Sequence, residues 1–349
     1  MITYTLTEWA TRPFSRTWTN IVDGDFADPQ LASQGAYDLL CYDRNAGSGA
    51  IFATVSNGNL NNGAPVQNGP VQVGGALTFD HRWSQIVAGP FGKSGAQLLF
   101  YDASTGTGEF FGLDASGNLH LINRNTGWLT SWTQIIAGKF TSDDGLQLLF
   151  YDAEAGIGDF WSVDNNASVH RVRTNTGWRN SWYSIIRGKF SDNKFDDLLF
   201  YDKSAGTGEF WHPDGSGGVE LFSSQTDWRA SWHGVKAGAF ALGSKYDGLL
   251  FYEDGTGYTE FYATDGKGGI SRLSVDLGAL WPSKAAHWRN VFAGNFIGTA
   301  LGGLSDLVAY DPDPVIVNAP PTLKKEERRI IHPIPFQGSI SYFQLLPHA

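Results

Sequence analysis

The chain has 349 residues and a formal net charge of −10, from 25 Lys and Arg against 35 Asp and Glu. An acidic balance excludes extended binding of a phosphate backbone and disfavours an anionic membrane surface, since both require clustered cations. The single cysteine, Cys41, excludes an intrachain disulfide and a cysteine zinc cluster. The 43 glycines and abundant aromatic residues are typical of short strands joined by tight turns.

The first residues, MITYTLTEW, alternate like a strand and lack the basic start and apolar core of a secretion signal. No apolar run approaches the roughly 18 residues of a membrane span. We therefore expect a soluble protein that is cytoplasmic or released without a classical signal peptide, with no membrane insertion.

Six repeats follow along the chain, and each begins with the pattern W-x-x-I/V-x-x-G-x-F. The repeats start at Trp18, Trp83, Trp132, Trp182, Trp232 and Trp288. A short apolar strand that ends in an aromatic residue and an acid comes next, as in QLLFYD at 97–102. A third strand follows a Gly-rich turn, as in GTGEFF. A fourth is visible at 118–123, 168–173 and 218–223.

Four short strands in each unit of about 50 residues predict an all-β fold, a β-propeller with six four-stranded blades. The last repeat reaches only its third strand, at 338–343. Residues 1–17 are expected to complete the last blade and close the ring, so that 1–349 form a single domain. Residues 55–80 are expected to be an enlarged turn, and 312–337 an insertion.

The six repeat-start tryptophans stand in fixed register, which indicates packing between blades. A second aromatic residue precedes them in looser register, as Trp128, Trp178 and Trp228, and is expected on a loop. Polar residues vary near it. They are the third-strand acids Glu109, Asp159, Glu209 and Glu260, together with Arg124, Arg179 and Arg229. Capped turns and solvated charges remain an alternative explanation for each of these residues.

No metalloprotease, serine-hydrolase or phosphate-binding motif is present, and the eight histidines are dispersed. The acids after each G-x-F do not match the regular calcium-binding run of integrin-like propellers. We therefore expect no catalytic residue, no metal site and no cofactor.

The combined pattern of W-x-x-I-x-x-G-x-F, LLFYD-x-x-x-G-x-G-E-F and N-T-G-W-x-x-x-W resembles the PLL-like bacterial propeller lectins, most strongly over 83–262. That family is described by seven blades, whereas this chain has six repeats, which leaves the number of sites and a cryptic seventh blade open. The resemblance implies a multivalent carbohydrate-binding protein without catalysis. Its shallow pockets between blades would accept fucosylated or related glycans.

A sugar offers a weakly apolar face to an indole and hydroxyls to charged side chains. The resemblance then suggests the sets Trp128/Glu109/Arg124, Trp178/Asp159/Arg179 and Trp228/Glu209/Arg229, with Glu260 in a further blade. The partners would be glycans on glycoproteins or glycolipids and not nucleic acid, and a homo-oligomer is compatible with this use.

Two other functions remain open from the sequence. An enzyme with a single site at the channel mouth would use asymmetric features, such as the 312–337 insertion, His287, His332 or the loop of the first blade. A protein-interaction scaffold or toxin-complex subunit would use the outer rim.

Overall fold

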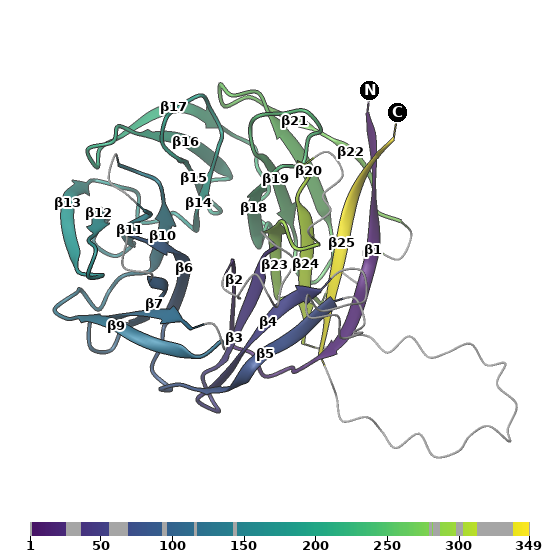
Figure 1. Ribbon diagram of the computed structural model, residues 1–349. Coiled ribbons are helices and arrows are strands. Elements are labelled where there is room, and N and C mark those ends of the chain that lie inside the picture. Colours follow the sequence, from purple (N-terminus) through teal and green to yellow (C-terminus); the bar gives the residue numbers. More distant parts are fainter. Residues whose placement is uncertain are drawn as a thin grey trace, which may run out of the picture.

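The computed structural model describes residues 2–25, 36–55, 69–92, 96–114, 117–141, 145–278, 281, 287–297, 303–312 and 338–348. Their strands form six antiparallel sheets arranged around an axis, as Figure 1 shows, and each sheet is one blade of a β-propeller. The predicted fold class and number of blades are confirmed. The 312–337 insertion lies, beyond its first residue, outside the described residues.

In each of the first five blades the strands follow one another from the axis outward. Blade 1 is β2 (Asn20–Gly24), β3 (Asp38–Asp43), β4 (Ser48–Val55) and β5 (Gly69–Thr78). Blade 2 is β6 (Gln85–Phe91), β7 (Ala96–Asp102), β8 (Thr107–Leu113) and β9 (Leu119–Asn125). Blade 3 is β10 (Gln134–Gly138), β11 (Gln147–Asp152), β12 (Ile157–Val163) and β13 (Val169–Thr176). Blade 4 is β14 (Ser184–Gly188), β15 (Asp197–Asp202), β16 (Thr207–Pro213) and β17 (Val219–Gln225). Blade 5 is β18 (Gly234–Gly238), β19 (Gly248–Tyr252), β20 (Thr259–Thr264) and β21 (Ile270–Arg272).

Part of the segment expected to be an enlarged turn in blade 1 is therefore strand β5. Its Gly and Pro residues stand on the outermost strand, where fewer ladder hydrogen bonds are needed.

The sixth sheet closes the ring with both ends of the chain. Its order is β22 (Ser274–Asp276), β1 (Thr3–Phe14), β25 (Gly338–His348), β24 (Asp306–Asp311) and β23 (Asn290–Gly294). Strand β1 is antiparallel to β25 and supplies the missing fourth strand, as predicted. Strand β22 adds a fifth, parallel to β1, and brings the end of blade 5 onto this sheet. The two termini consequently lie side by side in Figure 1.

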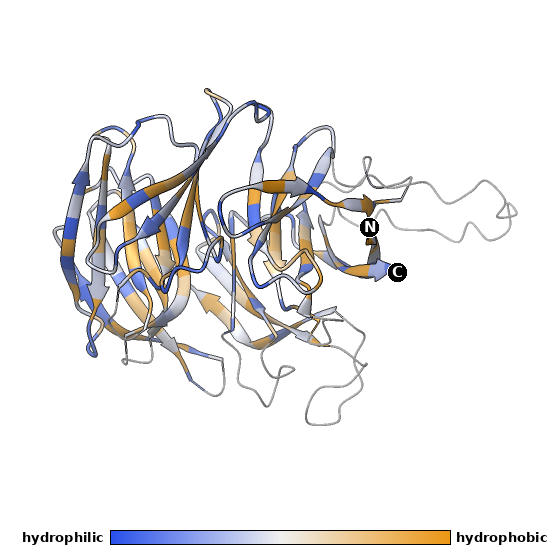
Figure 2. Cartoon of the chain, turned by 90° about the horizontal axis from the view of Figure 1, so that it is seen from above, coloured by the Kyte–Doolittle hydropathy of each residue, from blue (hydrophilic) through white to orange (hydrophobic). Residues whose placement is uncertain are grey.

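The second strand of each blade is buried on both faces because its alternate residues enter two different inter-blade cores. In β7, Leu98 and Phe100 pack toward blade 1. Leu99 and Tyr101 pack toward blade 3. Six such cores join the six blades in turn. The repeated LLFYD pattern therefore packs neighbouring blades together, and Figure 2 shows the apolar residues concentrated within the blades.

The tyrosine and aspartate that end this strand fix the turns. The Tyr151 hydroxyl donates to the Arg179 carbonyl of the next loop at 2.6 Å. The Asp152 carboxylate accepts from the backbone N–H groups of Glu154 and Ala155 at 2.9 and 3.0 Å. The same pairings recur at Tyr201 and Asp202. These residues hold the loop of each blade against its neighbour.

A buried oxygen at the start of the second strand braces the bend before it. In blade 3, Gln147 Oε1 accepts from the N–H groups of Phe140 and Thr141 at 2.8 and 2.9 Å. In blade 6, Asp306 Oδ2 accepts from Phe296 and Ile297 at 3.1 and 2.8 Å. Burial nonetheless raises the pKa of Asp306 to about 6, since desolvation outweighs these two donors. The neutral amide of Gln147 serves the same bend without this electrostatic cost.

We expect Asp306 to make stability fall as pH rises between 3.8 and about 6. A carboxyl whose pKa is raised in the folded state stabilises it below the unfolded pKa, and loses that contribution as pH rises through the folded pKa. A shift of roughly two units corresponds to about 3 kcal/mol. Denaturant unfolding of the wild type and of Asp306→Asn at several pH values measures the difference, which should favour the variant above pH 6. A difference that does not change with pH would contradict the assignment.

The described residues contain no helix that is long and apolar enough to cross a bilayer.

Candidate functional site

The three loop tryptophans proposed from the sequence are half-buried and pack between blades. Trp178 lies 6.1 Å from the Tyr151 ring of its own blade, and its indole meets Phe200 of the next blade edge-on at 5.0 Å. Trp128 and Trp228 make the corresponding contacts. Each indole thus fills space in an inter-blade core, and Trp178 and Trp228 also face a cavity.

The glycine of the third strand is required by this packing. A Cβ atom at Gly158 would lie 2.2 Å from the Trp178 ring, and one at Gly108 would lie 2.1 Å from Trp128. The pattern G-x-G before the third-strand acid is therefore explained by the close approach of an indole. Binding of a ligand is not needed to account for it.

The third-strand acids are buried, and each faces side chains of the same chain. Glu109 accepts from Arg124 Nε at 2.6 Å and from Arg82 at 3.1 Å. Asp159 lies 3.7 Å from Arg171. Glu209 pairs with Arg179.

Glu260 accepts from the hydroxyls of Tyr258 and Tyr262 at 2.7 Å each and pairs with Arg272 at 3.1 Å. Glu109, Glu209 and Glu260 are therefore occupied by groups of the protein itself. Asp159 is the exception, because its buried Oδ1 has no hydrogen-bond partner among the described residues.

The structure brings Arg124 and Glu109 together and separates members of the other two sets. Arg179 lies with Glu209 and not with Asp159, and Trp228 and Arg229 line a cavity with Glu260. The physical reason is that the loop after the fourth strand of one blade covers the third strand of the following blade. Spacing along the sequence does not reveal that crossing.

Two inter-blade cavities result, and they differ. One, of about 290 Å³, is lined by Trp178, Arg179, Trp182, Glu209 and Trp211. The other, of about 210 Å³, is lined by Trp228, Arg229, Trp232, Glu260 and Tyr262. In the first, the Arg179 guanidinium stacks over Trp182 at 4.7 Å, whereas Arg229 stacks over Tyr258 at 4.1 Å.

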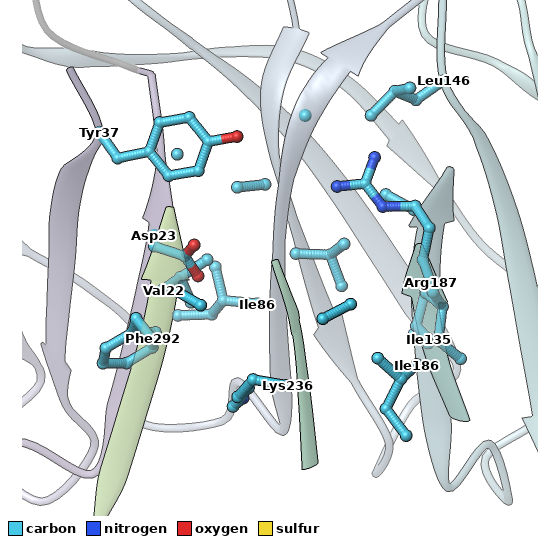
Figure 3. A pocket seen from close by; sticks show the side chains of 18 of the residues that line it. Val22, Asp23, Tyr37, Ile86, Ile135, Leu146, Ile186, Arg187, Lys236 and Phe292 are labelled. Carbon is cyan, nitrogen blue, oxygen red and sulfur yellow. The ribbon is translucent and has the colours of Figure 1, made fainter. Parts of the chain in front are cut away.

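A larger cavity, of about 770 Å³, follows the propeller axis and is lined by the innermost strands. Its wall includes many aliphatic residues, among them Val22, Ile86 and Ile135, together with polar groups. Figure 3 shows four polar side chains in this wall, namely Asp23, Tyr37, Arg187 and Lys236. We call these four residues the channel set.

Three members of the channel set are departures from the repeat. The two positions before the G-x-F glycine are a large apolar residue followed by alanine in blades 2, 3 and 6. Asp23 in blade 1 and Arg187 in blade 4 replace the alanine, and Lys236 in blade 5 replaces the apolar residue. Blades 1 and 4 are three apart in a ring of six, so Asp23 and Arg187 stand on opposite walls.

Electrostatics couple the channel set. Desolvation raises the pKa of Asp23, and the positive charges of Lys236 and Arg187 oppose the shift. Desolvation lowers the pKa of Lys236, and Asp23 opposes that shift. Among the described residues no direct ion pair joins Asp23 to either cation. Room for a ligand therefore remains between opposite charges.

Tyr37 reaches the cavity from the residue before β3. Its ring packs edge-on against Phe296 at 5.7 Å, and Figure 3 shows its hydroxyl directed across the cavity toward the guanidinium of Arg187. Desolvation and the charge of Asp23 raise the pKa of Tyr37, so the phenol keeps its proton. None of the channel set was proposed from the sequence. The signal that could have found three of them is a charge in a repeat position that is otherwise alanine or apolar.

No family model and no curated protein matches the chain. Solved structures that resemble it include a protein named "putative 6-phosphogluconolactonase" from Bacteroides fragilis, 14% identical over 78% of this chain and 84% of the other, with a TM-score of 0.45. Regucalcin from Agrobacterium tumefaciens, named a calcium-binding protein, is 14% identical over 99% and 96%, with a TM-score of 0.46. Sqt1 from Saccharomyces cerevisiae is 9% identical over 88% and 72%, with a TM-score of 0.43. At these identities the likeness concerns the fold alone.

The geometry of the site corrects the expectation of a multivalent lectin with repeated, equivalent sites. The three predicted sets are neither equivalent nor composed as expected, because the acids are engaged by different side chains in successive blades. The expectations about nucleic acid, partners and self-association stay predictions.

Proposed function

We propose that this protein is an enzyme with a single site in the axial channel, where Asp23 transfers a proton to or from a small organic anion. The observation that supports the proposal is the asymmetry of the channel. Three charged residues break a repeat that is otherwise apolar at these positions, and all three line one cavity. Catalysis generally requires one asymmetric site, and clustered titratable groups with shifted pKa values in a cavity mark such sites. This revises the expectation, drawn from the sequence, that the chain is not an enzyme.

The roles follow from position and charge. Arg187 presents a planar guanidinium whose geometry suits a carboxylate or phosphate of the substrate. Asp23, on the opposite wall, has a raised pKa and therefore exchanges its proton more readily near neutral pH than an ordinary aspartate does. Between them the innermost strands contribute aliphatic side chains, such as Ile86 and Ile135, to the wall.

We expect Asp23→Asn to lower proton exchange in the channel by about 100-fold, since a positioned acid–base group contributes on the order of 10²–10⁴. The measurement is exchange of hydrogen for deuterium in heavy water, followed by NMR. The compounds are small 2-oxo, hydroxy and amino acids, and the position followed is the carbon next to the carbonyl group. The asparagine keeps the shape of the side chain and removes the titrating group.

The matched control is Trp178→Ala, which alters an inter-blade cavity and leaves the channel untouched. It should exchange at the wild-type rate once its folding has been verified. Exchange that is absent with every compound, or that is equally fast in Asp23→Asn, would refute the proposal.

The likeness to the PLL-like propellers is, in this proposal, one of architecture. The shared motifs are the inter-blade tryptophans, the LLFYD strand and the G-x-G turn, and each is explained by packing or turn geometry. They specify blades and are compatible with a different activity in the channel.

A further inference from the structure

Tyr37 occupies a position that other blades use to brace their neighbour. Its backbone N–H donates across the blade boundary to the Asn295 carbonyl at 2.6 Å, and that of Asp196 donates to the Lys139 carbonyl at 2.8 Å. The Asp196 carboxylate then accepts from the Lys139 N–H at 2.8 Å, and Asp247 makes the same pair of contacts with the blade before it. Tyr37 carries a phenol in place of this acid, so its side chain is released from the bracing role.

The ring of Tyr37 is held in place, whereas its hydroxyl is left facing the cavity. A Cβ atom at Gly294 would lie 2.5 Å from Tyr37 Cδ2, so this glycine makes room for the ring, which also packs against Phe296. No hydrogen bond joins the hydroxyl to another residue that the structure describes. Figure 3 shows the hydroxyl directed across the cavity toward Arg187. An oriented donor without a partner is therefore present in the channel.

Arg187 also has donors to spare on the opposite wall. Its stem packs over blade 3, where a Cβ atom at Gly138 would lie 2.8 Å from Arg187 Cδ. Its side chain is 43% exposed, and its polar contact among the described residues is Asp196, at 3.5 Å. That distance is longer than the roughly 2.7–2.9 Å of a strong charged hydrogen bond, and one contact leaves most of the guanidinium N–H groups unused.

We infer that Tyr37 and Arg187 bind one oxyanion between them, a carboxylate or phosphate of the substrate. The inference deepens the proposed function, which assigns the anion to Arg187 alone. Both residues line the same cavity, and Figure 3 shows the hydroxyl and the guanidinium facing each other. Carboxylates and phosphates have several acceptor oxygens on one atom, so one oxygen can accept from the phenol and another from the guanidinium.

The electrostatics of Tyr37 agree with a role as donor. Burial and the charge of Asp23 raise the pKa of Tyr37, so the hydroxyl carries its proton at neutral pH. The charge of Arg187 acts on the same hydroxyl in the opposite direction, which places the two groups within range of each other. The anion is thereby held between the wall that bears Asp23 and the wall opposite to it.

The test is isothermal titration calorimetry of the full-length protein with inorganic phosphate and with acetate, in separate titrations. Tyr37→Phe keeps the ring and removes the hydroxyl. We expect it to weaken binding about tenfold, the contribution of one hydrogen bond to a charged group. The anion that the wild type binds more tightly identifies the substrate group as phosphate or carboxylate. Equal binding by Tyr37→Phe and the wild type, or no binding of either anion by the wild type, would overturn the inference.

Tyr183→Phe is the matched control, because Tyr183 is 45% exposed and lies outside the lining of the axial cavity. It should bind the anion as the wild type does. Arg187→Gln should weaken the same binding event, with a stoichiometry of one anion per chain. Two anions per chain, one lost in each variant, would overturn a shared site. Arg187 lies 3.5 Å from Asp196, so the folding of this variant is verified first by its denaturant midpoint.

The outcomes separate the two proposals. Anion binding that depends on Tyr37, without deuterium exchange that depends on Asp23, would retain the anion site and reject the proposed proton transfer. Exchange that depends on Asp23, with unchanged anion binding in Tyr37→Phe, would retain the enzyme and reject the role of Tyr37.

Discussion

Removal of the strand Thr3–Phe14 is expected to abolish cooperative folding of the propeller. This strand pairs with β25 along its whole length and places Tyr4, Leu6 and Phe14 in the two inter-blade cores that adjoin the closing sheet. Without it, the unpaired edge of β25 and the apolar residues beneath it would meet water. Such an edge is a template for aggregation.

Addition of the missing strand as a peptide tests whether strand pairing itself restores the fold. A truncated chain should elute as aggregates in gel filtration. A synthetic peptide of residues 3–14 present during refolding should restore the elution volume and the unfolding transition of the full-length protein, since an edge strand binds by main-chain pairing. A control peptide with aspartate at Leu6 and Ala10 should fail, because both positions are buried. A truncated chain that stays monomeric with an unchanged transition would contradict the closing role of β1.

Phe150→Ala is expected to cost about 3–5 kcal/mol of unfolding free energy, the range for loss of a buried aromatic side chain. Phe150 is 1% exposed and contacts three indoles, those of Trp128, Trp132 and Trp161, at 5.0, 5.3 and 6.0 Å between ring centres. An alanine there would leave a cavity that these rigid rings do not fill. Equilibrium denaturation with urea measures the change.

Leu129→Ala is the matched control for this variant. Leu129 is next to Trp128 in the loop of the same inter-blade core, yet its side chain is 47% exposed. Its structural contribution is made by the backbone carbonyl, which accepts from the Tyr101 hydroxyl at 2.7 Å and is retained in alanine. A change within about 0.5 kcal/mol is expected. Equal losses in the two variants would show that the indole cluster does not concentrate stability as we infer.

The fold was predictable because packing repeats. Every blade must bury the same surfaces against two neighbours, so residues such as Leu98 and Phe100 recur in fixed register and reveal the strands. Closure was predictable from the last repeat, which lacks a fourth strand. The parallel addition of β22 was not predictable, because a strand of only three residues has no recognisable sequence pattern.

The site was not predictable by the same logic. Trp178, Arg179 and Asp159 are close together in the repeat, whereas the contact of Arg179 with Glu209 crosses between blades. The channel set is visible in the sequence only as exceptions, such as Asp23 where four other blades have alanine. That the exceptions meet in one cavity depends on the number of blades and on how far apart around the ring they lie.

The pairing of β1 with β25 also determines how the ring responds to mechanical load. The strands are antiparallel, and their outermost pair is Thr3 with His348, so both chain ends emerge at the same end of the ladder. A force that pulls these ends apart acts on that pair first and then on Tyr4 and Pro347. The closure therefore opens by unzipping one pair at a time, at lower force than a ladder sheared along its length. A tether at both ends would weaken the ring, whereas a tether at one end leaves the seam unloaded.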